Sequence, residues 1–185
     1  MKIITLNNDD LENCCLSLCQ QVKTSNFIPD LILGIESGGK PIAEKIHRFL
    51  GLNDCELKFC QPVKKNRSDK GKLKVILKHM PLWALNLLRI LEAKMLFNSK
   101  LRNDIKEIIL PPDIDEFKNI LLVDDAVDSG STIKKIIEEI SEKGNAHIKS
   151  AVLTVTGKNP LILPDFYLFH NDTLIRFPWS IDAKK

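Results

Sequence analysis

The chain has 185 residues, of which 44% are hydrophobic and 28% are charged, and its formal net charge is +3. This length allows one sizeable hydrophobic core and is short for two, so we expect residues 1–185 to form a single domain. The small positive charge excludes the strongly basic surface of a nucleic-acid coat protein, although it allows a locally basic cleft for an anionic ligand.

Cysteine usage and hydropathy indicate a protein of a reducing cytoplasm. The five cysteines are Cys14, Cys15, Cys19, Cys55 and Cys60. Their number is odd, the N-terminus turns acidic before a signal peptide could develop, and no histidine accompanies residues 14–19 as a zinc site would require. We therefore expect buried thiols that act as small hydrophobic side chains. The longest apolar stretch, residues 80–97, contains Arg89, Glu92 and Lys94, so no membrane span is expected.

The first part of the chain predicts helices and strands in alternation. Apolar residues at helical spacing predict an amphipathic helix over residues 9–23. The apolar run LILGI, residues 31–35, is typical of a buried parallel strand. A glycine-rich turn then leads into a helix that begins near Pro41 and ends near Gly51, and a second strand is expected at residues 55–63.

Residues 64–112 interrupt the alternation of strands and helices with a basic loop and a long helical segment. The basic stretch KKNRSDKGK, residues 64–72, is expected to form a surface loop. Residues 78–103 predict a helical insertion, which Pro111 and Pro112 close. The apolar residues that share one face of this insertion are Leu82, Leu85, Leu88, Leu91 and Met95.

The last part of the chain continues the alternation. A strand over residues 119–125 leads through a polar loop into a helix over residues 131–143, and a strand at residues 147–156 follows. Residues 165–179 predict two short strands around a turn at Asn171-Asp172. Strands that alternate with helices imply an α/β fold in which helices flank a mainly parallel sheet.

Two glycine-bearing loops, residues 36–40 and 125–132, stand where parallel sheets bind ligands, beyond strand carboxyl ends and before helix N-termini. In the second loop, Gly130 permits close approach of the backbone to a ligand, and neighbouring hydroxyl side chains can donate to phosphate oxygens. Asp124 and Asp125 precede that loop. Two acids beside an anion site fit ribose hydroxyls or a hydrated Mg²⁺.

A purely structural explanation is also open for these residues. The strand could simply end and be followed by a helix whose N-cap is Ser129 or Ser131. That explanation leaves the two acids without a role. A P-loop is excluded, because the sequence has no Gly-Lys-Ser or Gly-Lys-Thr and no Gly-x-Gly-x-x-Gly after a strand.

Three stretches resemble type I phosphoribosyltransferases. ILLVDDAVDSGST, residues 120–132, resembles the family's signature for 5-phosphoribosyl 1-pyrophosphate (PRPP), and LILGIESGGKPIA, residues 31–43, is similar to its pyrophosphate loop. LPDFYLFHNDTLIRFPW, residues 163–179, resembles the end of xanthine, guanine and hypoxanthine phosphoribosyltransferases, where this region helps form the hood that holds the purine. The resemblance implies the type I fold, with a small hood at residues 160–185.

The resemblance also implies an enzyme that transfers a 5-phosphoribosyl group from PRPP to a base, taken to be a purine, with release of pyrophosphate and with Mg²⁺ as cofactor. Asp124 and Asp125 would hold the ribose hydroxyls and the metal, directly or through water. The 5′-phosphate would be bound by Asp128, Ser129, Gly130, Ser131 and Thr132. Pyrophosphate would be bound by Ser37, Gly38, Gly39 and Lys40.

The residues implied for the base are Asp128, Lys158, Phe177 and Trp179. Asp128 matches the position proposed to exchange a proton with the base in purine-specific relatives, and capping of the next helix is the alternative role. Core packing is the alternative for Phe177 and Trp179. Relatives specific for 6-oxopurines commonly carry a Lys where Thr156 stands here, so this sequence departs from the family pattern at that position.

The implied partners are PRPP and a nucleobase. A PRPP- or nucleotide-sensing regulator of the same fold, without catalysis, is the competing function. Nucleic acid is not expected as a partner, because Lys and Arg are scattered through residues 58–106 without interleaved aromatics. The insertion at residues 78–103 could cap the site, form a homodimer surface or replace the usual loop.

Overall fold

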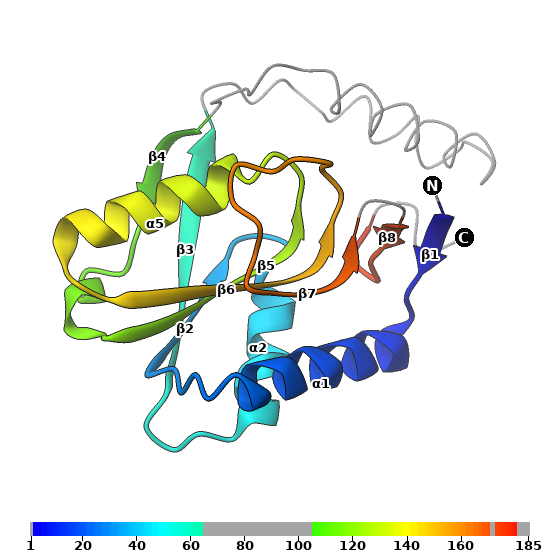
Figure 1. Ribbon diagram of the computed structural model, residues 1–185, viewed down its shortest axis with the longest axis horizontal. Helices are drawn as coiled ribbons and strands as arrows, with labels where there is room; N and C mark the ends of the chain where they lie inside the picture. The colour runs from blue at the N-terminus through cyan, green and yellow to red at the C-terminus, as the bar shows by residue number, and fades with distance from the viewer. Residues whose placement is uncertain (1, 65–104, 171–172, 181–185) are drawn as a thin grey trace.

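The computed structural model describes residues 2–64, 105–170 and 173–180 (Figure 1). The helical insertion predicted at residues 78–103 and all but the first residue of the predicted basic loop lie outside the described residues. The predicted turn at Asn171-Asp172 and the last residues of the hood segment, 181–185, lie outside them too.

A six-stranded sheet forms the centre of the molecule, in the order β4-β3-β2-β5-β6-β7 (Figure 1). Its strands are β2 (Leu31–Ile35), β3 (Glu56–Lys64), β4 (Ile105–Ile109), β5 (Asn119–Val127), β6 (His147–Val155) and β7 (Phe166–His170). Neighbouring strands are parallel except for β3 and β4, which are antiparallel. The predicted α/β fold with a mainly parallel sheet is confirmed, but the sequence patterns did not indicate β4.

Helices cover both faces of this sheet. The described α-helices are α1 (Asn8–Thr24), α2 (Lys40–Leu50) and α5 (Ser131–Lys143), and a short 3-10 helix, η1, spans Ile114–Glu116. Helix α1 begins with a capping box, in which Asp10 N donates to Asn7 Oδ1 at 2.8 Å and Asn7 N donates to Asp10 Oδ2 at 3.1 Å. The three helices predicted in these ranges are confirmed. None of the helices in the described ranges is long and apolar enough to cross a membrane.

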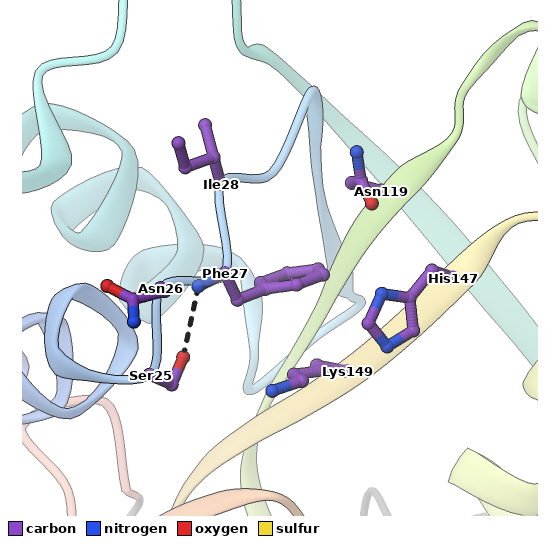
Figure 2. Close-up of a pocket in the computed structure, with 7 residues that line it drawn as sticks. All are labelled: Ser25, Asn26, Phe27, Ile28, Asn119, His147 and Lys149. Atoms are coloured by element: carbon purple, nitrogen blue, oxygen red, sulfur yellow. Dashed lines mark hydrogen bonds between the residues drawn. The ribbon is translucent and has the colours of Figure 1, made fainter.

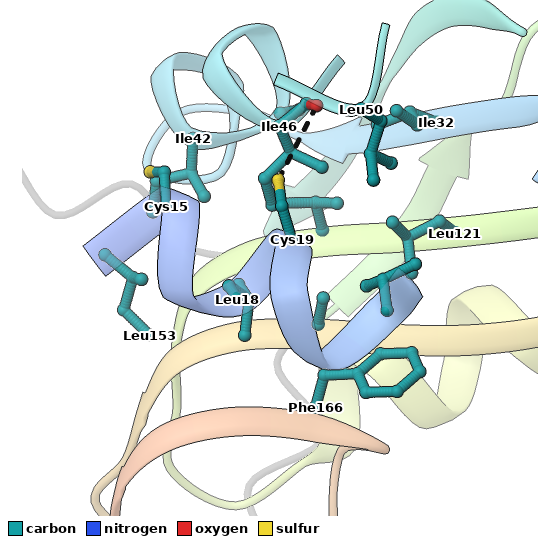
Figure 3. Close-up of a cluster of buried hydrophobic side chains, with 14 of the residues drawn as sticks. Cys15, Leu18, Cys19, Ile32, Ile42, Ile46, Leu50, Leu121, Leu153 and Phe166 are labelled. Carbon is teal, nitrogen blue, oxygen red and sulfur yellow. Dashed lines mark hydrogen bonds between the residues drawn. The ribbon is translucent and has the colours of Figure 1, made fainter. Parts of the chain in front are cut away.

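Two hydrophobic clusters pack on opposite faces of the sheet. On one face, α1 and α2 pack against Ile32, Leu121 and Phe166, as Figure 3 shows. On the other face lie α5 and η1. Strand β2 is buried along its whole length because it lies between β3 and β5 and beneath both layers, which is why its sequence is apolar without alternation.

The cysteines are free thiols, and four of them are buried: Cys15, Cys19, Cys55 and Cys60. Burial raises the pKa of both Cys15 and Cys60 to about 12, so these thiols stay protonated at neutral pH. Cys15 and Cys19 lie among the aliphatic side chains that join α1 to α2 (Figure 3). The prediction of buried thiols in residues 14–19 is confirmed for Cys15 and Cys19, whereas Cys14 is only partly buried.

A second sheet joins the beginning of the chain to its end. Strand β1 (Lys2–Thr5) runs parallel to β8 (Thr173–Arg176). Arg176 is only 4% exposed and donates from Nη1 to Thr5 Oγ1 at 3.0 Å. Both short strands predicted near the C-terminus are present, but β7 pairs with β6 in the main sheet whereas β8 pairs with β1, which was not predicted.

Candidate functional site

At the centre of the sheet, between β2 and β5, the order of the strands reverses. From β2 the chain passes through α2 to β3 on one side, and from β5 it passes through α5 to β6 on the other side. The two helices pack on opposite faces of the sheet. Strands β2 and β5 are adjacent and parallel, so both glycine-bearing loops begin at the same edge. Open α/β sheets bind ligands in the crevice at such a point.

The loop between β2 and α2 lies directly against the end of β5. A Cβ atom at Gly38 would overlap the carboxyl group of Asp125. A Cβ atom at Gly39 would lie 2.8 Å from Ile35 O and 2.9 Å from Asp124 Cα, closer than the 3.0 Å below which real Cβ contacts essentially never fall. Position 39 therefore requires glycine, whereas a side chain at position 38 would displace the Asp125 carboxyl group. The backbone of the predicted pyrophosphate loop thus lies beside the predicted ribose acids.

The same loop leads into the start of helix α2. Gly39 is the N-cap, no side chain caps the helix, and Pro41 has no N–H, so the N–H groups of Lys40 and Ile42 are the ones that the start of α2 offers to an anion. Ser37 is exposed, and Lys40 Nζ lies 4.8 Å from the centre of the Phe59 ring. The four residues predicted to hold pyrophosphate thus form one continuous turn at the crevice.

The two acids lie at the end of β5, where Asp125 N donates to Asp124 Oδ1 at 2.8 Å. Burial raises the pKa of Asp125, while hydrogen bonds, among them one with the side chain of Trp179, partly oppose that rise. An indole N–H can only donate, so the Trp179 side chain lowers the Asp125 pKa as a hydrogen-bond donor. Trp179 also stacks on Phe177, with ring centroids 4.9 Å apart and planes 4° apart. The predicted hood segment therefore lies beside Asp125.

The loop before helix α5 ends on Gly130, which is the N-cap and has a φ of +74°. A left-handed residue at this position favours glycine. Ser129 Oγ and Ser131 Oγ are 2.9 Å apart, and Ser131 N lies 3.4 Å from Ser129 Oγ, which is a long hydrogen bond. The alternative in which Ser129, Ser131 or Asp128 is the N-cap is wrong, because the helix begins on a residue without a side chain. Its N-terminal N–H groups remain largely available to a phosphate.

Asp128 lies between this loop and the end of β6. Burial raises the pKa of Asp128, and a hydrogen bond from the Thr156 side chain partly opposes that rise. A Cβ atom at Gly157 would overlap Asp128 O, and Leu161 N donates to Ser129 O at 2.8 Å. The segment after β6 therefore forms one wall of the site.

The structure brings most of the predicted site residues together at this edge. Trp179 and Gly38 meet at Asp125, while the loop from Asp128 to Thr132 follows directly from β5. Lys158 is exposed on the segment after β6. Sequence reasoning missed the contribution of Gly157, although a glycine directly after a buried strand is a signal for close backbone approach.

A pocket of about 260 Å³ lies at the opposite edge of the sheet, at the amino ends of β5 and β6, as Figure 2 shows. It is lined by Ser25, Asn26, Phe27, Ile28, Asn119, His147 and Lys149. The Phe27 ring contacts His147 edge-on at 5.3 Å, and Lys149 Nζ lies 5.4 Å from the same ring. Because this pocket contains no carboxylate and no glycine-rich loop, it does not match the predicted phosphate and ribose sites.

Within the described ranges, no group of three or more His, Cys, Asp or Glu side chains is placed to hold a metal ion. A divalent cation at Asp124 and Asp125 would therefore need further oxygen ligands from a substrate or from water, which is the usual manner in which Mg²⁺ binds.

Known proteins share features with most of this chain. The family model described as the phosphoribosyl transferase domain matches residues 7–184. No curated protein matches the chain. A purine phosphoribosyltransferase from Pyrococcus horikoshii Ot3 has a similar structure, with a TM-score of 0.65 and 22% identity over 97% of this chain and 95% of that one.

Two further solved structures share the fold. The xanthine-guanine-hypoxanthine phosphoribosyltransferase of Helicobacter pylori has a TM-score of 0.68 and 18% identity, and the match covers 99% of this chain and 97% of that one. A hypothetical protein from Neisseria gonorrhoeae with bound ppGpp has a TM-score of 0.61 and 18% identity, covering 98% of this chain and 92% of that one. At these identities the likeness establishes a common fold.

Proposed function

The chain belongs to the phosphoribosyltransferase family of enzymes, and from this premise we propose that it transfers the 5-phosphoribosyl group of PRPP to a ring nitrogen of a purine base and releases pyrophosphate. The observation that carries the proposal is the contact between the Gly38 backbone and the Asp125 carboxylate. This contact joins an anion-binding turn to a pair of acids, and PRPP requires both within one ligand length.

The substrate roles follow from the chemistry of each group. Asp124 and Asp125 would accept hydrogen bonds from the ribose hydroxyls. The turn from Ser37 to Lys40 would bind pyrophosphate through its N–H groups other than that of Gly39, which donates to Ile35 O at 2.9 Å. The loop from Asp128 to Thr132 would bind the 5′-phosphate at the start of α5. The 5′-phosphate and the pyrophosphate would therefore each be held at a helix N-terminus, with the sugar between them.

Mg²⁺ fits this donor set, because it binds through one or two carboxylates together with substrate phosphates and water. Asp124 and Asp125 are the residues that would hold it, directly or through water. The ion would supply positive charge that neutralises the leaving pyrophosphate. Chelation of the metal should therefore abolish turnover and weaken PRPP binding.

A purine is the base that the site favours. Trp179, which is 39% exposed and stacks on Phe177, offers an aromatic surface at the acids, with Asp128 on the side of β6 and Lys158 on the segment that follows. Phe177 is only 6% exposed and packs in the hydrophobic core, so its part is to support the Trp179 ring. A carboxylate with a raised pKa is suited to proton exchange with a ring nitrogen near neutral pH. The like-folded proteins from P. horikoshii and H. pylori are purine phosphoribosyltransferases by name, which adds support.

The competing proposal is a sensor of PRPP or of a nucleotide without catalysis. One specific observation favours it, namely that the like-folded protein from N. gonorrhoeae has ppGpp bound. A nucleotide with two diphosphate groups could use the same two anion-binding turns.

Pyrophosphate release with PRPP, Mg²⁺ and a panel of guanine, hypoxanthine, xanthine and adenine tests both proposals. The transferase should turn over at least one base, and Asp128→Asn should lower kcat by about 10²-fold because a general base typically contributes 10²–10⁴-fold. Asp115→Asn, an exposed acid in η1, is the matched control and should leave kcat unchanged. Binding of PRPP or ppGpp without turnover of any base would instead support the sensor.

We also propose that residues 1–185 form one domain, with residues 160–185 as the hood and the segment 78–103 as a helical insertion, and that the chain forms a homodimer in the cytoplasm. Five free thiols in this chain are in keeping with a reducing compartment. Sedimentation equilibrium of the full chain and of a variant with residues 78–103 replaced by a short linker tests the role of the insertion in dimerisation.

A further inference from the structure

The segment between β6 and β7 runs along the loop that leads from β5 to α5. Near the start of this segment, Thr156 N donates to Val127 O at 2.8 Å, and further on Leu161 N donates to Ser129 O at 2.8 Å. Thr156 Oγ1 also lies 3.2 Å from Val127 O. Residues 156–162, which we call the bracing segment, are thus attached to the loop through carbonyl groups of the loop.

Gly157 brings the bracing segment into contact with the residue between these two hydrogen bonds. A Cβ atom at Gly157 would overlap Asp128 O, and it would lie 2.9 Å from the carbonyl carbon and 3.6 Å from the Cα atom of Asp128. Since the oxygen is the nearest of these three atoms, the Asp128 carbonyl group points toward Gly157. No side chain fits between the two backbones, so position 157 requires glycine.

The close approach continues at Gly130, the N-cap of α5. A Cβ atom there would lie 3.0 Å from both the N and the O atoms of Ile162 and 3.2 Å from Leu161 N. Just beyond the bracing segment, Asp165 Oδ2 accepts hydrogen bonds from Ser150 N at 2.8 Å and from Ser150 Oγ at 3.0 Å. Because Ser150 is a buried residue of β6, the bracing segment is fixed to the main sheet at both of its ends.

Three successive carbonyl groups of the loop, those of Val127, Asp128 and Ser129, therefore face the bracing segment. The peptide bonds that follow them are trans, and in a trans peptide the C=O and N–H groups point in opposite directions. The N–H groups of Asp128, Ser129 and Gly130 consequently point away from the bracing segment. In the described part of the chain, none of these three N–H groups donates to a protein atom. Successive N–H groups of this kind form an anion-binding concavity.

We propose that Gly157 is a positioning residue for the 5′-phosphate. Because Gly157 lets the bracing segment reach the Asp128 carbonyl group, the loop keeps its carbonyl oxygens on the side of the bracing segment and its N–H groups on the side of the phosphate. A carbonyl oxygen carries partial negative charge, so one turned toward the phosphate would weaken its binding. The proposal rests on the proposed function, which assigns the 5′-phosphate to this loop.

Calorimetry of Gly157→Ala in the full chain tests this role with two probes, each of which carries one anionic end of PRPP. Ribose 5-phosphate carries the 5′-phosphate, and inorganic pyrophosphate carries the other end. In saturating Mg²⁺, the Kd for ribose 5-phosphate should rise roughly tenfold in Gly157→Ala, because the added Cβ atom forces the loop away from the bracing segment. The Kd for pyrophosphate should stay within about twofold of the parent value, since the turn from Ser37 to Lys40 is its assigned site.

Gly144→Ala is the matched control, because a Cβ atom there lies 3.7 Å from its nearest neighbour, and this variant should bind both probes as the parent does. An unchanged Kd for ribose 5-phosphate in Gly157→Ala would overturn the proposal. Equal losses for the two probes would overturn it too, since a general loss of structure weakens both sites. If Gly157→Ala does not fold, Leu161→Pro, which removes the N–H that donates to Ser129 O, is measured in its place under the same criterion.

Amide NMR spectra of the same proteins check the direction of the N–H groups. Addition of ribose 5-phosphate to the parent should shift the amide signals of Asp128, Ser129 and Gly130, and these shifts should be smaller in Gly157→Ala. Shifts confined to other residues would contradict the proposal. If the parent binds neither ribose 5-phosphate nor PRPP, the proposed function fails and the role of Gly157 fails with it. Binding by the parent that Gly157→Ala leaves intact would refute the role of Gly157 alone.

Discussion

Replacement of Gly38 by Ala should weaken the binding of Mg²⁺ and PRPP without unfolding the protein. The three atoms nearest to an added Cβ all belong to the carboxyl group of Asp125, and the farthest of them, Oδ1, is 2.6 Å away. Ordinary contact begins at 3.4 Å, so either the loop or the carboxylate must move. Movement of the Asp125 carboxylate would displace it from the position in which it would hold the ribose.

The size of this effect follows from the cost of overpacking, which is about 1–3 kcal/mol for extra carbon atoms in a filled site. If the ligand has to restore the original arrangement, this cost appears as a roughly 5- to 150-fold increase in the Kd for PRPP. Isothermal titration calorimetry of PRPP in saturating Mg²⁺ measures it. Gly144→Ala is the matched control, because a Cβ there lies at an ordinary 3.7 Å from its nearest neighbour. A Kd for Gly38→Ala within twofold of the parent value would refute the close approach of the loop to Asp125.

Three further outcomes are expected. Trp179→Phe removes the indole donor to Asp125, so the Kd for PRPP measured by calorimetry should rise by roughly fivefold, as for the loss of about 1 kcal/mol of hydrogen bonding. Asp128→Asn should increase the free energy of unfolding in urea at neutral pH. Burial raises the pKa of Asp128 in the folded protein above 3.8, so the charged carboxylate lowers the stability of the folded state at neutral pH. The increase should fade as the pH falls through the folded-state pKa to below 3.8, where the carboxyl group is neutral in both states. Gly130→Ala should lower the free energy of unfolding by more than Gly51→Ala. Both glycines have a positive φ, which costs about 1–2 kcal/mol for Ala. An added Cβ atom would lie 3.0 Å from Ile162 at position 130, but 4.0 Å from its nearest neighbour at position 51.

Local pattern determined the central strand and the helices that flank it. The run LILGI is apolar at every position and forms a strand buried on both faces. Helix α5 follows its predicted limits because the chain changes there from hydroxyl and glycine residues to helical spacing. These features depend on residues close together in the sequence, whose periodicity reports directly which faces are buried.

The residue types of the candidate site were also readable from the sequence. Two acids, a glycine and several hydroxyls after a buried strand are consistent with one kind of ligand, and the sheet places them at the edge where ligands bind. The sequence could not distinguish an N-cap role for Ser129 from a ligand role, because both use the same side chain. The backbone excludes the N-cap role by placing Gly130 at the N-cap, and the ligand role of Ser129 stays a prediction.

Only the tertiary structure decided which distant residues meet. Strand β1 pairs with β8, the Gly38 backbone lies against the Asp125 carboxyl group, and the Gly157 backbone lies against Asp128 O. A short strand such as β1 carries too few residues to show a pattern of its own, and its stability comes from a partner at the other end of the chain. Contacts of this kind depend on the folded path of the backbone, so the sequence determined the chemistry that is present, and the fold determined which groups act on one another.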